Sequence, residues 1–196
     1  MDKHLTSLSD HILSFWFGRP DAEGGYSSRE AWWQKDPAFD AEICSRYLGP
    51  HGRAVTGELD AMAQTAEGAL SLILLLDQFP RNMFRGNPAC YASDEQARTI
   101  ATQALDAGFD QTMPAVWRWF IYMPFEHSEH LADQALSVSL FESLPEMPGW
   151  DETVAAAHRH REIVARFGRF PHRNEILCRH STPEELEFLK QPNSSF

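Results

Sequence analysis

Apolar residues recur three and four positions apart in window after window of this chain, and strict alternation over the length of a strand is hard to find. This spacing puts apolar side chains on one face of a helix, whereas a half-buried strand requires a period of two. The pattern therefore predicts an all-α fold. Connections are short and contain Gly or Pro, and no linker divides residues 1–196. We expect a single domain of about eight to ten packed antiparallel helices.

Glycines, prolines and capping residues delimit the individual helices. Ser93 and Gln96 have the spacing of a capping box, and Thr182 followed by Pro183 and Glu185 has the same signature. A proline is expected to end the helix before it. The helices predicted in this way cover residues 5–17, 37–48, 67–78, 93–107, 114–122, 125–144, 150–167 and a short segment from 183. Because residues 70–76 are apolar on every side except at Ser71, this helix should lie at the centre of the domain.

Composition restricts the class of partner. The chain of 196 residues has 17 Lys and Arg against 28 Asp and Glu, a net charge of −11. An acidic chain repels a phosphate backbone, so we expect no nucleic-acid partner. The longest apolar run, Leu72–Leu76, is far shorter than the roughly 18 residues of a membrane span, so we expect no membrane association. No export signal is recognisable at the start, which makes the cytoplasm the expected location.

Cysteines and aromatic residues favour structural roles. The three cysteines are widely spaced without a Cys-x-x-Cys pair, so we expect free and mostly buried thiols. The pairs Trp32/Trp33 and Trp117/Trp119 could form a stacking platform for a ligand. Core packing is the favoured interpretation, because large aromatic side chains dominate cores of this size.

Two stretches share one form, residues 77–82 (Asp-Gln-Phe-Pro-Arg-Asn) and residues 169–174 (Arg-Phe-Pro-His-Arg-Asn). In each, proline is expected to stop a helix and to place Arg and Asn at a fixed turn. The rigid fork of arginine suits a carboxylate or a phosphate. Alternatively, the asparagines cap the next helices and the arginines pair with Asp77 or Glu175. The candidate ligand-binding residues of the two turns are Arg81, Asn82, Arg169, Arg173 and Asn174.

Charge is distributed unevenly along the chain. Between His158 and His180, six arginines against two glutamates give a local charge of +4, so the rest of the chain carries −15. This asymmetry is typical of a basic surface or pocket that holds a small anionic molecule or an acidic peptide segment. The alternative is that the arginines neutralise acidic neighbours.

The densest polar cluster follows Pro124 and includes Glu126, His127 and His130. If Pro124 opens a helix, His127 and His130 share one face with Gln134, which makes His130 a further ligand-binding candidate. Glu and His can act as acid and base near neutral pH. Alternatively, acidic residues in a first turn complement the helix dipole and the histidines lie in solvent.

Glu126 cannot orient His127 directly, because adjacent helical residues diverge. The partner of His127 would therefore be Asp77 or His172, and the candidate catalytic residues are His127, Glu126, His172 and Asp77. The cluster contains neither His-Glu-x-x-His nor Glu-x-x-His, so no metal site is predicted. The chain also lacks Gly-x-Ser-x-Gly and the glycine-rich phosphate and dinucleotide fingerprints, so no cofactor is expected.

Several long motifs resemble those of the bacterial domain-of-unknown-function family 924. They cover residues 12–18, 32–40, 74–86, 123–129 and 166–174, and the similarity extends over nearly the whole chain. The resemblance implies a tetratricopeptide-like helical fold and no assigned activity. Its motifs coincide with the polar clusters chosen above on chemical grounds, including Asp77, Arg81, His127 and Arg173.

Two functions from different classes remain open. In the first, a binding module holds a small anionic molecule or an acidic peptide through the Phe-Pro turns. In the second, a small-molecule enzyme uses His127 with Glu126, Asp77 or His172 as acid and base on a substrate oriented by arginines. The sequence alone does not decide between them, nor does it define an oligomeric state.

Overall fold

The structure is a computed structural model that describes residues 3–22 and 24–195, and this part of the chain is helical without strands. The all-α prediction is confirmed. None of the described helices is both long enough and apolar enough to cross a membrane. The α-helices are α1 (Lys3–Phe17), α2 (Pro37–Val55), α3 (Ala66–Ile73), α4 (Phe79–Met83), α5 (Asp94–Asp106), α6 (Ala115–Glu126), α7 (Leu131–Glu142), α8 (Trp150–Phe167) and α9 (Pro183–Phe188). The short 3₁₀ segments include η1 (Glu30–Trp32), η2 (Asp60–Gln64), η4 (Pro88–Tyr91), η5 (Asp110–Thr112) and η6 (Pro171–Arg173).

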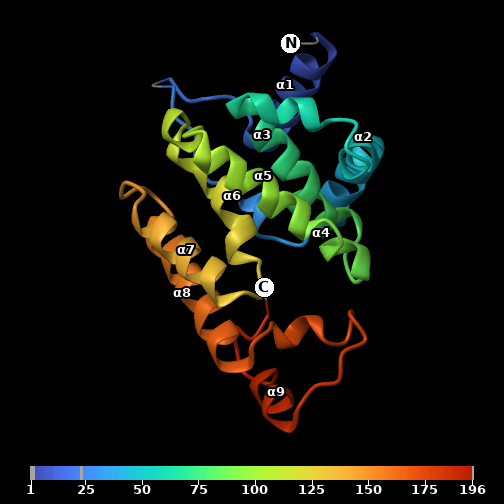
Figure 1. The fold of residues 1–196 in the computed structure, drawn as a ribbon, viewed down its shortest axis with the longest axis vertical. Coiled ribbons are helices and arrows are strands. Elements are labelled where there is room, and N and C mark those ends of the chain that lie inside the picture. The colour runs from blue at the N-terminus through green and yellow to red at the C-terminus, as the bar shows by residue number, and fades with distance from the viewer. Residues whose placement is uncertain (1–2, 23, 196) are drawn as a thin grey trace.

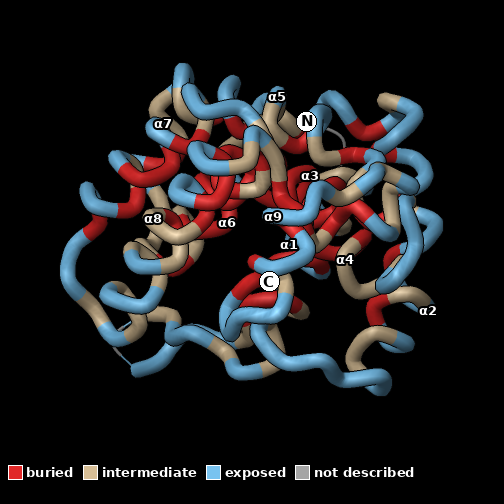
Figure 2. Tube along the Cα trace, turned by 90° about the horizontal axis from the view of Figure 1, so that it is seen from below, coloured by how far each residue is buried: buried red, intermediate tan, exposed pale blue. Residues whose placement is uncertain are grey.

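Helix α3 lies at the centre of the larger part of the molecule, against α1, α5 and α6. Helices α6, α7 and α8 pack in succession, and α9 lies at the far end (Figure 1). Figure 2 shows that the buried segments gather in α1, α3 and α6, whereas the outer helices are largely exposed. Every residue from Leu70 to Leu76 is buried, as the apolar sequence predicts.

The prediction that the central helix ends before Pro80 is wrong. After α3 the chain forms a single π-helical turn, η3 (Leu74–Gln78), and continues directly into α4. The N–H of Phe79 donates to the carbonyl of Leu74, five residues back, as in a π-bulge. The wider turn carries the chain past Pro80 without ending the helix.

The carbonyl groups around this turn are satisfied from outside the helix. Pro80 has no N–H to donate to Leu76, and the Leu76 carbonyl instead accepts the Ser93 hydroxyl at 2.6 Å. The Leu75 carbonyl lies 2.9 Å from Nδ1 of His51 in α2. Buried carbonyl groups require hydrogen-bond partners, and Ser93 and His51 supply them here. These tertiary contacts therefore allow the helix to continue through Pro80, where the sequence rule for proline predicts that it ends.

Ser93 occupies the predicted N-cap position of α5, but it does not form the predicted capping box. Its side chain makes no cap hydrogen bond to α5. Gln96, the other predicted member of that capping box, donates to the Val55 carbonyl at 3.1 Å. The second predicted box is confirmed, because Thr182 and Glu185 exchange both hydrogen bonds at the start of α9.

Helix α2 is longer than predicted. It passes through Gly49 and Pro50 and ends at Val55 rather than at residue 48. Tyr47, His51 and Ala54 lie three to four positions apart and are all buried. Burial of this continued face outweighs the unfavourable intrinsic propensity of glycine and proline.

The predicted helix over residues 125–144 is also wrong. Pro124 lies inside α6 instead of opening a helix, α6 ends at Glu126, and α7 begins at Leu131. His127 is the C-cap of α6, and His130 is the N-cap residue of α7. The two histidines therefore do not share a helix face. Eight consecutive residues at the end of α6, 119–126, are buried, which explains why the helix continues through the proline, since packing stabilises it on all sides.

The three cysteines are free, as predicted. The expectation that they are mostly buried is wrong, because Cys90 is buried, Cys44 is half-buried and Cys178 is exposed.

Candidate functional site

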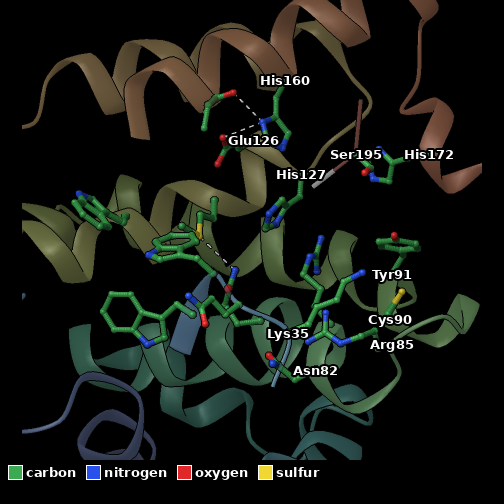
Figure 3. Close-up of a pocket in the computed structure, with 18 of the residues that line it drawn as sticks. Lys35, Asn82, Arg85, Cys90, Tyr91, Glu126, His127, His160, His172 and Ser195 are labelled. Atoms are coloured by element: carbon green, nitrogen blue, oxygen red, sulfur yellow. Dashed lines mark hydrogen bonds and ion pairs between the residues drawn. The ribbon is translucent and has the colours of Figure 1, made fainter. Parts of the chain in front are cut away.

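A cavity of about 830 Å³ opens where α4, α6, α8 and the segments around η1 and η6 meet. Figure 3 shows His127 directed from the end of α6 toward a wall that includes Lys35, Arg85 and Tyr91. The polar and aromatic residues that line the cavity include Trp32, Trp33, Lys35, Gln78, Arg81, Asn82, Arg85, Tyr91, Trp119, Glu126, His127, Glu152, His160, His172 and Arg173, and the apolar Met123 lies among them. Cavities of this size hold small molecules with several functional groups.

A hydrogen bond joins Asp77 of the π-turn to His127. Nδ1 of His127 lies 2.7 Å from Oδ1 of Asp77, whose side chain is fully buried. Burial alone would raise the pKa of Asp77, but the positive charge of Arg81 and the contact with His127 outweigh it and lower the pKa to about 2. Burial and Arg81 lower the pKa of His127. The pair therefore consists of a carboxylate and a neutral imidazole at neutral pH.

The carboxylate of Asp77 determines which ring nitrogen of His127 carries the proton. A carboxylate accepts hydrogen bonds, so Nδ1 must be the donor and Nε2 keeps its lone pair. Gln78 also donates from its amide to Asp77, at 2.5 Å, and holds the carboxylate from the other side. This arrangement leaves Nε2 of His127 able to accept a proton or a hydrogen bond.

Arg81 in α4 is held by two carboxylates and one carbonyl. Its guanidinium makes a two-pronged contact with Asp94 at 2.9 and 3.0 Å and donates to the Asp77 carbonyl at 2.6 Å. A bidentate contact of this kind fixes both position and orientation. Arg81 lines the cavity as a rigid cation whose charge is largely balanced by Asp94 and Asp77.

Unlike Arg81, Arg173 has few partners that balance its positive charge or accept its hydrogen bonds. It is 7% exposed, its guanidinium lies 4.5 Å from the rings of both Tyr91 and Phe170, and its nearest carboxylate, Asp94, is 3.7 Å away. Nε of Arg173 is buried and has no hydrogen-bond partner among the described residues. Burial and the nearby Arg81 lower the pKa of Arg173. A buried cation with so few hydrogen bonds is costly to the free protein.

Glu126 is a buried carboxyl group in the same wall. Burial raises its pKa to about 8, and Asp77 adds to the shift. Oε1 of Glu126 lies 3.1 Å from Nδ1 of His160, but that nitrogen is directed to the Ala156 carbonyl at 2.8 Å. Glu126 is therefore a neutral acid at pH 7. Burial lowers the pKa of His160 to about 3, which keeps this imidazole neutral as well.

Two further candidates, His172 and Asn82, have different surroundings. His172 lines the cavity, and burial together with the charge of Arg173 lowers its pKa to about 4. Asn82 also lines the cavity, but its amide donates to Asp40 at 2.7 Å, where Arg85 also binds. Neither asparagine of the two Phe-Pro turns caps the start of the next helix, because Asn82 lies inside α4 and Asn174 is the C-cap residue of η6.

Arg169, Asn174 and His130 do not line the cavity. Arg169 makes a two-pronged contact with Glu185 at 2.7 and 2.8 Å, and Asn174 reaches the same carboxylate at 3.3 Å. These side chains hold the start of α9 against the end of α8. His130 is exposed and its backbone N–H donates to Ser128. As ligand-binding residues these three stay untested, and the candidate site no longer includes them.

The arginine-rich segment is mainly a set of ion pairs. Arg166 binds Glu184, Arg169 binds Glu185 and Arg179 binds Glu129. The interpretation that arginines neutralise acidic neighbours therefore describes most of this segment, and Arg173 is the member that reaches the cavity.

Some lining residues carry no signal that sequence analysis could have used. Tyr91 ends the short segment η4, and its position becomes evident only when Arg81 and Arg173 are placed beside it. The same holds for Asp94, which does not line the cavity but binds Arg81 beside it. The adjacent pair Trp32/Trp33 is a sequence signal for Trp33, although core packing is the favoured interpretation of that pair. Trp32 does pack in the core, but Trp33 is 54% exposed and lines the cavity.

The candidate site combines cationic side chains with acid–base side chains. Among the residues that the structure describes, no group of three or more His, Cys, Asp or Glu side chains is arranged to hold a metal ion. Its working groups are arginines, a neutral histidine oriented by a carboxylate, and a protonated carboxyl. These define an all-helical protein with a cationic cavity that contains a buried Asp–His pair.

The chain belongs to the DUF924 family of bacterial proteins of unknown function, whose model matches residues 12–193. It is similar to a solved protein of unknown function from Agrobacterium tumefaciens, ATU0120, with 41% sequence identity and a TM-score of 0.84. The similarity covers 94% of this chain and 98% of that one. No curated protein matches the chain. The family resemblance and the helical fold are thus confirmed, while the similarity to tetratricopeptide repeats stays a prediction.

Proposed function

We propose that the cavity binds a small organic anion, with Arg173 as its principal contact. The observation that carries this proposal is the poorly compensated guanidinium of Arg173 in the wall of an 830 Å³ cavity. An anionic ligand would supply the hydrogen-bond acceptors that Arg173 lacks. Carboxylates and phosphates are the groups that match an arginine fork.

The other charges of the cavity support an anion rather than a cation. Arg81 and Arg85 are balanced by Asp94 and Asp40, which lie behind them. Glu126 would repel an anion if it were ionised, but its raised pKa keeps it neutral and able to donate a hydrogen bond. Four of the side chains that line the cavity are cationic, Lys35, Arg81, Arg85 and Arg173, against Glu152 and the neutral Glu126, although the whole chain is acidic.

Binding can be tested with acetate and inorganic phosphate as probes, by thermal shift and calorimetry at low salt. A ligand present at about 100 times its Kd stabilises the folded state by about 2.7 kcal/mol, a shift of several degrees in Tm for a chain of this size. Arg173→Ala should remain folded by circular dichroism and bind about 10-fold more weakly or worse.

Arg166→Ala is the matched control, because Arg166 pairs with Glu184 on the surface and does not line the cavity. It should bind like the wild type. The proposal fails if neither probe stabilises the wild type, or if the Arg173 variant binds both as well as the wild type does.

The bond between Asp77 and His127 favours a second candidate function, an acid–base enzyme acting on such an anion. Arg173 and Arg81 would orient the substrate, and Nε2 of His127 would take a proton from it or from a water molecule. Asp77 would stabilise the imidazolium that forms. Glu126, neutral at pH 7, would return a proton to the product.

Turnover of a panel of small carboxylate and phosphate esters tests this second function. His127→Ala should lower kcat by about 100-fold or more while anion binding persists, and Asp77→Asn should lower kcat through the wrong imidazole tautomer. Wild-type protein that binds anions and turns over none of the panel would leave the binding function standing alone.

A further inference from the structure

The cavity has two chemically different ends. Helices α6 and α8 run in the same direction along it, joined by α7, which packs against both. Near their starts, Gly149 adjoins Trp119, since a Cβ at Gly149 would lie 3.2 Å from the indole. Further along, Glu126 at the end of α6 lies 3.1 Å from His160 in α8. A helix rises 1.5 Å per residue, so the seven residues from Trp119 to Glu126 separate the two ends by about 10 Å.

The cationic end lies beyond the last turn of α6. His127 joins Asp77 there, and Asp77 contacts Arg81. Arg81 and Arg173 share Asp94, which places both guanidinium groups at this end. An anionic group bound to Arg173 would therefore lie near Glu126 and far from Trp119.

The other end is aromatic. The ring of Trp32 lies 4.9 Å from that of Phe120, the neighbour of Trp119 in α6, and Trp33 meets Trp32 edge to face at 6.1 Å. Met123, one turn after Trp119, lines the cavity between the two ends. Trp33 stays 54% exposed, and its indole N–H is held by Ser28 at 2.9 Å. A large aromatic face left open in a cavity is typical of a ligand contact rather than of a core residue.

We propose that the ligand is an organic anion about 10 Å long, with its anionic group at one end and an aromatic ring at the other. This inference rests on the proposed anion-binding function and adds the substrate class. The anion would contact Arg173, the connecting chain would pass Met123, and the ring would pack against Trp33 and Trp119. A cavity of 830 Å³ is far larger than acetate or phosphate requires, and a ligand of this length uses both ends.

Calorimetry with four probes tests the inference: acetate, octanoate, 4-phenylbutyrate and 4-phenylbutan-1-ol. We expect 4-phenylbutyrate to bind about 30-fold more tightly than acetate, because ring burial adds apolar and stacking contacts. It should also bind more tightly than octanoate, which lacks a ring, and than the alcohol, which lacks the charge.

Trp33→Ala should weaken binding of 4-phenylbutyrate by about 10-fold and leave acetate unchanged, since Trp33 lies at the ring end. Leu131→Ala is the control, because Leu131 is equally exposed and does not line the cavity. The ring assignment is overturned, while anion binding stands, if acetate binds but 4-phenylbutyrate binds no more tightly than acetate. The same holds if the Trp33 variant binds 4-phenylbutyrate as tightly as the wild type does, or if octanoate binds as tightly as 4-phenylbutyrate. If no anion binds, or the alcohol binds as tightly as 4-phenylbutyrate, the anion-binding function itself is overturned.

Discussion

Replacing Glu126 with glutamine should make the protein more stable than the wild type, by a difference in the free energy of unfolding that grows as the pH rises. The side chain of Glu126 is 5% exposed, and burial raises its pKa from 4.5 to about 8. Between these two values the unfolded chain has released this proton while the folded protein still holds it. A raised carboxyl pKa therefore lowers the free energy of unfolding as the pH increases from 4.5 to 8.

The size of the effect follows from the shift. Each pKa unit corresponds to about 1.36 kcal/mol, so raising the pH from 5 to 8 should cost the wild type up to about 4 kcal/mol at this single group. Glutamine has nearly the same shape and does not titrate. For about 200 residues, this difference corresponds to a Tm gap of roughly 10 °C between the variant and the wild type at pH 8. At pH 5 the two proteins should differ by less than about 1 kcal/mol.

Urea unfolding of both proteins at intervals from pH 5 to pH 9 measures the gap directly. Glu152→Gln is the matched control, since Glu152 lines the same cavity but is exposed. It should follow the wild-type curve at every pH. A constant offset between Glu126→Gln and wild type across the range would refute the conclusion that Glu126 is protonated at neutral pH.

Three further predictions concern the packing that positions the site. Leu74→Asp should prevent folding, because Leu74 is fully buried and a lone carboxylate there costs several kcal/mol, which circular dichroism would detect. Gly68→Ala should strongly lower the free energy of unfolding, since the added Cβ would lie 2.0 Å from the Met62 carbonyl oxygen. Gly52 has open space around it, so Gly52→Ala should raise the free energy of unfolding by about 0.5–1 kcal/mol in the same urea assay. Arg169→Ala should lower the free energy of unfolding by leaving the carboxylate of Glu185 without its charged partner, yet leave the affinity for acetate unchanged in calorimetry.

Local chemistry could be predicted from the sequence where it depends on neighbours along the chain. The apolar spacing predicts the helical fold, the run around Leu74 predicts the central helix, and Thr182 with Glu185 predicts its capping box. The same reasoning selected Arg81, His127 and Arg173, which all line the cavity. It also named Asp77 as a partner for His127.

The tertiary structure decided the points at which distant segments override a local rule. Pro80 does not end its helix because Ser93 and His51 satisfy carbonyls of the π-turn. Pro124 does not begin one because packing buries the whole end of α6.

The site itself was decided in the same way. Equivalent arginines of the two Phe-Pro turns have different surroundings. Asp94 balances the charge of Arg81 through a bidentate contact. Arg173 is stacked between two aromatic rings, and its buried Nε lacks a hydrogen bond to any described residue. Sequence patterns report which residue types are available and on which helical face they lie. Burial and the charges of other segments determine whether an arginine is neutralised or left to bind an anion. They also determine whether a carboxyl group such as Glu126 keeps its proton. The charge state of these groups depends on solvent exclusion and on distances between residues far apart in the chain, which a sequence pattern does not report.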